Sequence, residues 1–233
     1  MSRGIFYGVG VGPGDPELLT RKAVRVLERC EVIAAPRTRS GEMLALDIVR
    51  AAVPVEGKRI LPLHFTMARD KSQWRAAHEQ AAWAVAEELA AGRSVAMPNL
   101  GDVSIYSTFG YLKTLLEEQG YETVMVPGVP SFCAAAARLG VSLCSGDGPL
   151  HIIPVGGDGL RDSLEQPGAK VLMKAGRDFR HLVETLDSTG QLERAVLMEN
   201  CGLPGERICR DLRELSQAPG YFSTVLVQEA PVE

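Results

Sequence analysis

The sequence predicts an α/β protein with two α/β domains, the first built on a mainly parallel sheet and the second on a mixed sheet. Three observations predict this class. The 233 residues fit one large or two modest domains. Hydrophobic residues make up 45 % and charged residues 23 %, which is ordinary for a packed globular protein. In the first half, short apolar runs alternate with amphipathic stretches, as in parallel strands joined by helices.

The first half alternates strand and helix in order. Asp15 followed by Pro16 is typical of a helix start, because Asp caps free backbone amides and Pro fits the first turn. Gly92 and Gly120 follow two helical patterns, where glycine commonly ends a helix. We expect strands at 5–11, 32–35, 58–61 and 94–98, and helices at 17–29, 42–52, 71–91 and 104–119.

The second half has shorter strands and fewer helices, which favours a mixed sheet. The domain boundary is predicted near Gly120, with an N-terminal domain at 1–119 that carries the glycine-rich loop and a C-terminal domain at 120–233. We expect strands at 121–126, 150–154, 170–173, 195–199 and 222–228, and helices at 132–139 and 179–187.

Charge and residue counts exclude several classes of protein. The net charge of −4 predicts neither nucleic acid nor an anionic membrane surface as a partner. No apolar run reaches the length of about 20 residues that spans a bilayer, and the first residues lack the features of a secretory signal. The five cysteines form no C-x-x-C pair and the four histidines lack metal-ligand spacing. We therefore expect no metal site and a reducing, cytoplasmic compartment.

The first functional signal is the glycine-rich stretch GVGVGPGDPELLT at 8–20, between a predicted strand and helix. Such a turn lets a ligand approach backbone amides. The dinucleotide fingerprint G-x-G-x-x-G fails in both frames, because Pro13 or Asp15 stands at its last position. This failure counts against an oxidoreductase of the NAD type. The alternative is a glycine turn needed only for tight packing.

Two further segments stand at strand-to-helix turns. In NLGDVSIYSTFGYL at 99–112, Gly101 permits a tight turn and Asp102 places a carboxylate at the edge of the sheet where open α/β sheets bind ligands. A helix cap made by Asp102 or Ser104 is the competing interpretation, and both can hold. In VPGVPSFCAAAARLG at 126–140, two prolines and a glycine stiffen a turn before an alanine-rich helix.

Together these segments resemble the tetrapyrrole methylase superfamily. The family pattern G-x-G-P-G-D-P-x-L-L-T corresponds to GVGPGDPELLT at 10–20. The second family pattern, G-D-P with hydroxyl-rich residues, corresponds to GDVSIYST at 101–108, where Val103 replaces the usual Pro. That replacement, with YSTFGYL and PGVPSF, resembles the branch that methylates C20 of precorrin-2 or cobalt-factor II in cobalamin biosynthesis.

The resemblance implies a class III methyltransferase: two α/β domains with the active site in the cleft between them, in a homodimer that uses S-adenosyl-L-methionine. It implies a tetrapyrrole substrate, with Pro13 and Asp15 on the substrate side. By matching motif positions, it implies cofactor contacts at Leu100, Gly101, Asp102, Val103, Ile105, Tyr106, Ser131, Phe132, Lys174 and Thr224.

Residue chemistry suggests two further roles under this resemblance. A base must take the proton from C20, and Asp102 is the first candidate and Tyr106 the second; a cofactor-binding or capping role for Asp102 is the alternative. The loop PRTRSGE offers Arg37, Arg39 and Ser40 to the carboxylates of the macrocycle, because arginine binds carboxylates bidentately. A solvated charged loop is the competing interpretation.

Rival functions remain open at this point. Within the superfamily these are methylation at another tetrapyrrole position, or methylation of ribosomal RNA or an elongation factor. The acidic balance counts against RNA. Outside it, the rivals are an oxidoreductase of the NAD type and a ligand-binding module without turnover.

Overall fold

The computed structural model describes residues 3–38, 40–66 and 70–229. The chain divides into two compact units, Met1–Pro130 and Ser131–Glu233. Each unit contains its own five-stranded sheet.

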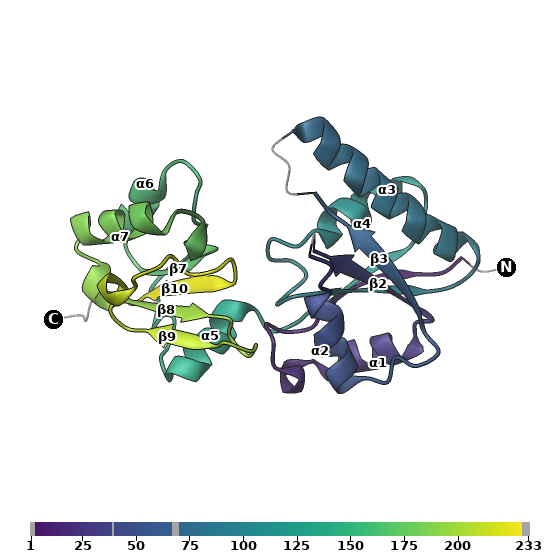
Figure 1. The fold of residues 1–233 in the computed structure, drawn as a ribbon, viewed down its shortest axis with the longest axis horizontal. Coiled ribbons are helices and arrows are strands. Elements are labelled where there is room, and N and C mark those ends of the chain that lie inside the picture. The colour runs from purple at the N-terminus through teal and green to yellow at the C-terminus, as the bar shows by residue number, and fades with distance from the viewer. Residues whose placement is uncertain (1–2, 39, 67–69, 230–233) are drawn as a thin grey trace. The chain divides into compact units, whose positions relative to one another are not determined.

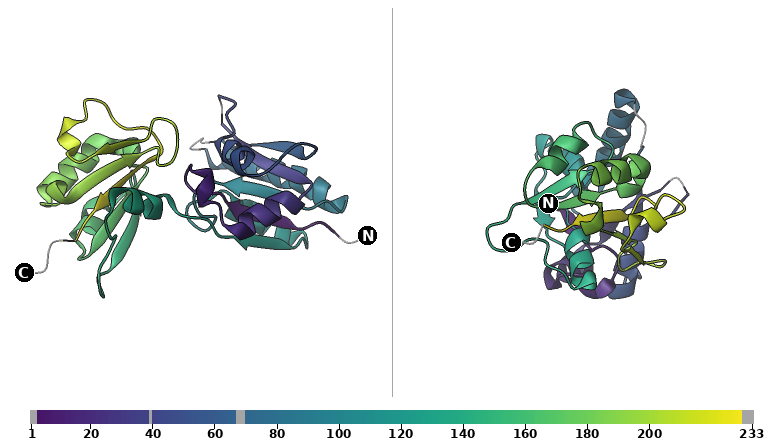
Figure 2. Two further views of the ribbon diagram at one scale, coloured as in Figure 1. Left: turned by 90° about the horizontal axis from the view of Figure 1, so that it is seen from below. Right: turned by 90° about the vertical axis from the view of Figure 1, so that its left-hand side faces the viewer.

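The first unit contains a parallel sheet of strand order β3-β2-β4-β1-β5, as predicted. Helices α3 and α4 cover one face and α1 and α2 cover the other (Figure 1), and the view from below in Figure 2 shows α1 in front of the sheet. The elements are β1 (Phe6–Gly10), α1 (Arg21–Arg29), β2 (Val32–Arg37), α2 (Leu44–Ala52), β3 (Arg59–His64), α3 (Lys71–Ala90), β4 (Val95–Asn99), α4 (Phe109–Glu118) and β5 (Thr123–Val126).

The core under α3 and α4 is aromatic at its centre. The rings of Phe6 and Phe109 are both fully buried, with centroids 4.9 Å apart. Gly8, in the middle of β1, lies directly beneath the Phe109 ring, and a Cβ at Gly8 would come within 2.6 Å of ring atoms. The first glycine of the glycine-rich stretch is therefore required by core packing.

Two predicted helices start later than expected. The stretch predicted as one helix at 17–29 begins with a 3-10 turn, Pro16–Leu18, capped by Asp15 as predicted, and Thr20 then caps a separate α1. The helix predicted at 104–119 begins only at Phe109. Before it, Tyr106 has a left-handed backbone with φ of 50°, which a continuous helix cannot contain.

The second unit contains a mixed sheet of order β6-β7-β10-β8-β9, again as predicted. Of the described strands of this unit, β6 and β7 pair in parallel and the other neighbours pair antiparallel. Helices α6 and α7 lie on one face and α5 on the other (Figure 1). The elements are α5 (Ser131–Leu139), β6 (Leu150–Pro154), α6 (Leu160–Glu165), β7 (Ala169–Met173), α7 (Phe179–Ser188), β8 (Ala195–Glu199), β9 (Arg207–Cys209) and β10 (Ser223–Val227). The short α6 and β9 were not predicted.

The two units divide about ten residues later than the predicted boundary near Gly120. Strand β5 pairs in register with β1 through Phe6 and Thr123, so it completes the first sheet rather than opening the second. Gly120 ends α4, but a helix end is not a domain end when the next strand returns to the same sheet.

Among the residues that the structure describes, no helix is long and apolar enough to cross a membrane. In the same part of the chain, no group of three or more His, Cys, Asp or Glu side chains is arranged to hold a metal ion.

The Gly8 contact yields a stability prediction. Gly8→Ala is expected to lower the free energy of unfolding by about 1–3 kcal/mol, because the added methyl group must displace a ring in a packed core. Gly110→Ala is the matched control, since a Cβ there meets nothing within 4 Å, and replacing a helical glycine by alanine is expected to add about 0.5–1 kcal/mol. Urea denaturation measures both; equal effects would contradict the packing argument.

Candidate functional site

The loops that follow β1, β4 and β5 meet at the carboxyl edge of the first sheet. Strands β1 and β4 are neighbours, but the helices that follow them, α1 and α4, lie on opposite faces (Figure 1). In open α/β sheets, the edge where connections diverge in this way is the usual place for a ligand.

Four glycines, Gly10, Gly12, Gly101 and Gly128, bring these three loops into backbone contact; we call this set the glycine junction. A Cβ at Gly10 would lie 2.6 Å from the backbone nitrogen of Gly128, and one at Gly128 would collide with the carbonyl oxygen of Gly101. Gly12 and Gly101 also have positive φ angles of 76° and 70°, which side chains disfavour. A side chain therefore has no room at Gly10 or Gly128 and would strain the backbone at Gly12 or Gly101.

The backbone groups of the glycine junction bond to one another. Gly101 N–H donates to the Gly12 carbonyl at 2.8 Å, Gly12 N–H donates back at 3.3 Å, and Val11 N–H donates to the Asn99 carbonyl at 2.9 Å. A phosphate-binding loop needs such amides free to face its ligand. The structure therefore supports the tight-packing interpretation of the first glycine-rich loop.

Asp102 fastens the loop after β4 to the loop after β5. One carboxylate oxygen accepts the backbone N–H of Ser104 at 2.8 Å and its hydroxyl at 2.5 Å. The other accepts the backbone N–H of Gly128 at 2.8 Å. Both oxygens are thus engaged before any ligand is considered.

The surroundings of Asp102 lower its pKa. Partial burial on its own would raise the pKa, but the hydrogen bonds from the Ser104 hydroxyl and from the Ser104 and Gly128 amides favour the carboxylate and outweigh it. A carboxylate held this way is a weak proton acceptor. The geometry therefore favours the capping and positioning role of Asp102 over the role of base.

Asn99, which sequence reasoning did not select, fixes the other end of the same loop. Its side chain is buried; the amide donates to the Met97 carbonyl at 2.7 Å and accepts the Ser107 hydroxyl at 2.7 Å. The same Ser107 oxygen accepts the first amide of α4, from Phe109, at 3.1 Å. A polar residue at the end of an otherwise apolar strand is the signal that could have identified it.

The remaining predicted cofactor residues of this loop differ in exposure. Val103, which stands where the family pattern has Pro, is buried in the core under α3 and α4. Leu100 and Ile105 are half-buried, and Tyr106 is 49 % exposed. The loop thus presents apolar and hydroxyl groups on a backbone that is fixed at both ends.

The predicted substrate residues lie on two other loops of the first unit. Pro13 is buried, and Asp15 accepts the Glu17 amide at 2.9 Å. Arg37 ends β2 and donates to the Gly41 carbonyl at 3.2 Å. Ser40 donates to the Glu42 carboxylate at 3.0 Å, and Arg39 lies outside the described residues.

In the second unit, Lys174 and Thr224 lie together at one edge of the mixed sheet. Thr224 pairs with Met173, the residue before Lys174. Lys174 has a left-handed backbone with φ of 59°, and its ammonium lies 5.7 Å from the centre of the Tyr221 ring. Such sparsely populated backbone conformations cluster at functional sites.

Ser131 and Phe132, the other predicted cofactor residues of the second unit, open α5. Phe132 is buried, and α5 packs against β10, the strand that contains Thr224. The second unit therefore brings all four of its predicted residues to two adjoining elements and the turn after β7.

Glu199, also missed from the sequence, holds the loop beside Lys174. It ends β8, is bonded by the guanidinium of Arg207 at 2.7 Å and accepts the backbone N–H of Gly220. Asn200, the next residue, is the second left-handed non-glycine at this edge, with φ of 53°. A single acidic residue at a strand end gave no sequence signal for this role.

Comparison with known proteins identifies relatives over nearly the whole chain. The family described as Tetrapyrrole (Corrin/Porphyrin) Methylases matches residues 6–216. A cobalt-precorrin-2 C(20)-methyltransferase from Salmonella typhimurium is 34 % identical over 231 residues, which cover 97 % of each chain. A precorrin-2 C(20)-methyltransferase from a Sinorhizobium species is 31 % identical, covering 96 % of this chain and 95 % of the relative.

Solved structures share the fold. A cobalt precorrin-4 methyltransferase matches with a TM-score of 0.75 at 20 % identity, covering 96 % of this chain and 94 % of the other. A uroporphyrin-III C-methyl transferase from Thermus thermophilus, complexed with S-adenyl homocysteine, matches with a TM-score of 0.71 at 23 % identity, covering 96 % and 97 %. The predicted α/β fold class is thereby confirmed.

The bonds of Asp102 yield a pH-dependent prediction. Asp102→Asn is expected to lower the free energy of unfolding at pH 7 by about 1–3 kcal/mol. The reason is that the NH₂ group of asparagine then faces N–H or O–H groups that donate to a carboxylate oxygen in the wild type. The pKa of Asp102 is lowered by folding, so its ionised form stabilises the fold above the ordinary pKa of about 4. That stabilisation is lost as the pH falls through the lowered folded value.

Denaturation of wild type and variant across this pH range measures the difference, which should shrink at low pH. Asp47→Asn is the matched control, because Asp47 forms only an exposed pair with Arg50. A difference for Asp102 that stays constant with pH would contradict the assignment.

Proposed function

The chain belongs to the tetrapyrrole (corrin/porphyrin) methylase family, and from this premise we propose that it transfers a methyl group from S-adenosyl-L-methionine to C20 of precorrin-2 or cobalt-factor II in cobalamin biosynthesis. One observation carries the proposal: relatives named as C20-methyltransferases of precorrin-2 and cobalt-precorrin-2 align with 96–97 % of the chain at 31–34 % identity. Cytoplasmic location and a homodimer are part of the proposal and rest on the family resemblance.

The residues at the two sheet edges suit S-adenosylmethionine, which has apolar, hydroxyl and charged parts. In the first unit, half-buried Leu100 and Ile105 alternate with the exposed side chains of Ser104 and Tyr106 on a loop fixed by Asp102. In the second unit, the set is Ser131, Phe132, Lys174 and Thr224. Gly101 and Val103 contribute shape rather than polar groups, because one is a junction glycine and the other is buried.

When bound, S-adenosylmethionine supplies an activated methyl group. The task of the chain is then to hold the acceptor carbon in line and to exclude water. Asp102 serves this task by fixing the loop, since its three hydrogen bonds set the position of the residues up to Tyr106. We accordingly assign Asp102 to positioning and Tyr106 to a proton relay, in which its exposed phenol oxygen takes the proton that leaves C20 while its own O–H proton passes to solvent water.

Recognition of the macrocycle is proposed for the loops after β1 and β2. Pro13 and Asp15 belong to the first loop, and Arg37, Arg39 and Ser40 to the second. The Arg37 side chain is exposed and uses only its Nε in a described hydrogen bond, to the Gly41 carbonyl. The two terminal nitrogens of its guanidinium suit a substrate carboxylate.

The central test is methyl transfer from labelled S-adenosylmethionine, with precorrin-2 and cobalt-factor II assayed in parallel and the methylated carbon identified by NMR. Methylation of C20 on either substrate is expected. Methylation at another carbon would replace the proposed position by a different tetrapyrrole reaction. Binding of S-adenosylmethionine without methyl transfer would instead favour the rival function, a ligand-binding module.

Tyr106→Phe tests the proton step in the same assay. A positioned group that relays a proton contributes about 10²–10⁴-fold, so removing the hydroxyl is expected to lower kcat by about 10²-fold or more while donor affinity is kept. Tyr111→Phe, an exposed tyrosine on α4, is the control and should leave kcat unchanged. An unchanged kcat in Tyr106→Phe would remove the proton role.

Arg37→Glu tests substrate recognition. Loss of a charged hydrogen bond to a macrocycle carboxylate, with repulsion in its place, is expected to weaken substrate binding by about tenfold or more and to spare donor binding. Arg25→Glu, on the exposed face of α1, is the matched charge reversal. Isothermal titration with each ligand separates the outcomes, and parallel loss of both affinities would indicate damage to the fold instead.

A further inference from the structure

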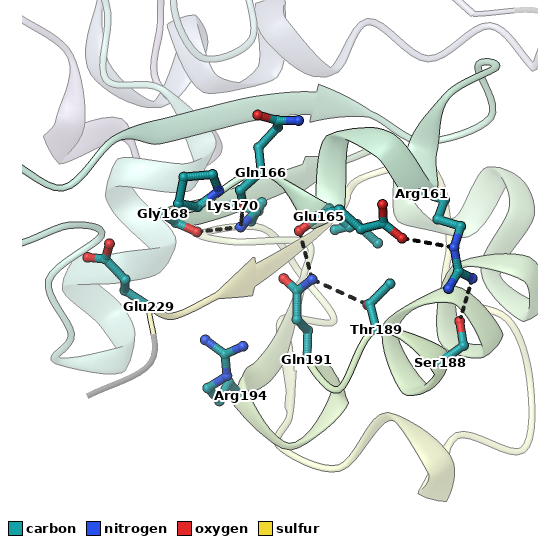
Figure 3. A pocket seen from close by; sticks show the side chains of 12 residues that line it. Arg161, Glu165, Gln166, Gly168, Lys170, Ser188, Thr189, Gln191, Arg194 and Glu229 are labelled. Atoms are coloured by element: carbon teal, nitrogen blue, oxygen red, sulfur yellow. Dashed lines mark hydrogen bonds and ion pairs between the residues drawn. The ribbon is translucent and has the colours of Figure 1, made fainter. Parts of the chain in front are cut away.

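The second unit contains a depression at one end of its strands, and Lys174 lies at the other end. Strand β7 starts at Ala169 and ends at Met173, so Lys170 stands at one end and Lys174 just past the other. Four steps along the extended chain, of about 3.3 Å each, separate their backbones by about 13 Å. The depression has a volume of about 630 Å³ and is lined by residues of α6, the end of α7 and the starts of β7 and β8 (Figure 3).

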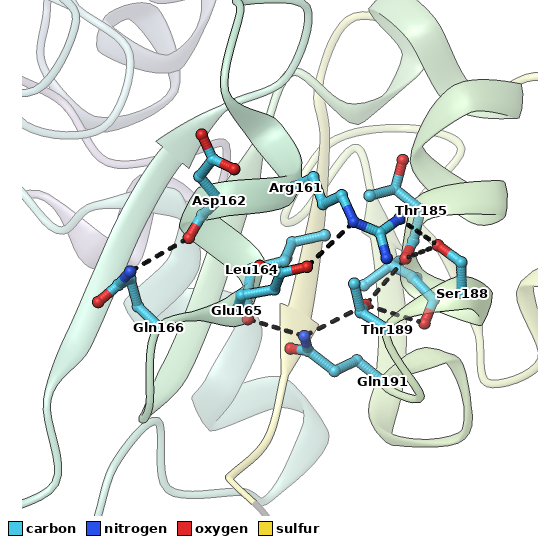
Figure 4. Close-up of polar contacts among 10 residues, drawn as sticks. Arg161, Asp162, Leu164, Glu165, Gln166, Thr185, Ser188, Thr189 and Gln191 are labelled. Atoms are coloured by element: carbon cyan, nitrogen blue, oxygen red, sulfur yellow. Dashed lines mark hydrogen bonds and ion pairs between the residues drawn. The ribbon is translucent and has the colours of Figure 1, made fainter.

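Gln191 carries a buried oxygen that no described group satisfies. Its side chain is 94 % buried, and its amide nitrogen donates to the Leu164 carbonyl at 2.8 Å and to the Thr189 hydroxyl at 3.3 Å (Figure 4). Because a carbonyl only accepts, the contact with Leu164 fixes which end of the amide is nitrogen. The oxygen is a buried atom that no donor in the described chain reaches, and Figure 3 shows it on the side of the amide that is turned toward the depression.

Two cations stand beside this oxygen. Lys170 is 95 % buried and donates to the carbonyls of Gln166 and Gly168 at 2.5 and 2.6 Å, which leaves its third N–H. Arg194 donates through one terminal nitrogen to the Gln228 carbonyl at 2.9 Å. Within residues 3–38, 40–66 and 70–229, neither forms an ion pair. In Figure 3 the Gln191 oxygen points toward the space between them.

The charges around Lys170 are unbalanced. Burial lowers the pKa of the Lys170 ammonium, and the nearby Arg194 lowers it further, while Glu229 acts in the opposite direction. Arg161 does not add to this excess of positive charge, because it is already paired with Glu165 at 3.0 Å and bonded to Ser188. An anion between Lys170 and Arg194 would relieve their repulsion.

We propose that this depression binds a small carboxylic acid that carries a hydroxyl or amino group on the carbon next to the carboxylate. The carboxylate lies between Lys170 and Arg194, and the neighbouring O–H or N–H donates to the Gln191 oxygen. Three cationic and two anionic side chains line the depression, so its net charge suits a monoanion better than a phosphate dianion. The volume, within the usual range for ligand pockets, leaves room for a longer side chain.

The site is independent of the proposed methyl transfer. Its residues are distinct from those assigned to the donor and the macrocycle, and they lie at the other end of β7. Binding there is therefore measurable on the full chain without either reactant.

The experiment is an NMR titration of the full ¹⁵N-labelled chain with three probes of the same carbon skeleton: propionate, L-lactate and L-alanine. Propionate has the carboxylate alone, lactate adds a hydroxyl and alanine adds an amino group. Resonances of the Gln191 side-chain amide and of the Lys170 backbone report on the depression. We expect L-lactate or L-alanine to shift them and to bind about tenfold or more tighter than propionate, because only they satisfy the buried oxygen.

Arg194→Gln is expected to weaken binding of the tighter probe about tenfold, and Arg180→Gln, an exposed arginine of α7 outside the depression, should leave it unchanged. The spectra also report whether each variant is folded. The proposal is overturned by any of three results: no shift with all three probes at tens of millimolar, equal affinity for propionate, or undiminished binding in folded Arg194→Gln.

Discussion

The contact between Gly128 and the loop after β4 is the constraint on which the first unit depends. There the backbones of three loops touch, and the Asp102 carboxylate closes the contact by accepting the Gly128 amide. Because no side chain fits at Gly10 or Gly128, the paths of all three loops are set together. The positions of Leu100, Ile105 and Tyr106 follow from that arrangement, so a packing requirement determines which groups the edge of the sheet offers to a ligand.

The same constraint explains why a glycine-rich loop here differs from a nucleotide loop. In a phosphate site, glycines expose amides to the ligand; here the amides of Val11, Gly12 and Gly101 bond to the chain itself. Chemistry at this edge must come from side chains instead. The second unit uses a comparable device, because Glu199 bonds both Gly220 and Arg207 and so fixes the loop beside Lys174. In both units the end of the sheet thus combines a loop held by hydrogen bonds with residues whose backbone is left-handed, Tyr106 in the first unit and Lys174 and Asn200 in the second.

Much of the fold was predictable because it depends on local patterns. The strands Leu150–Pro154 and Ala195–Glu199 have the predicted bounds, and Asp15 caps as expected. The misses have a common cause in distant contacts: the turn before α4 replaces helix because Asp102 and Ser107 bond to other groups, and β5 joins the first sheet because β1 is its partner. Asn99 and Gln191 act through such contacts as well, so no spacing in the sequence reveals them. The assignment of individual site residues stays a prediction.

The ring of Phe109 over Gly8 also bears on how such chains can diverge. A larger residue at position 8 becomes tolerable only after the ring at position 109 has been replaced by something smaller, and that replacement on its own leaves a void between β1 and α4. Substitutions at the two positions are thus tied to each other across a hundred residues of sequence. Descendants of a common ancestor should consequently fall into two groups, each with its own matched pair, and intermediates should be rare.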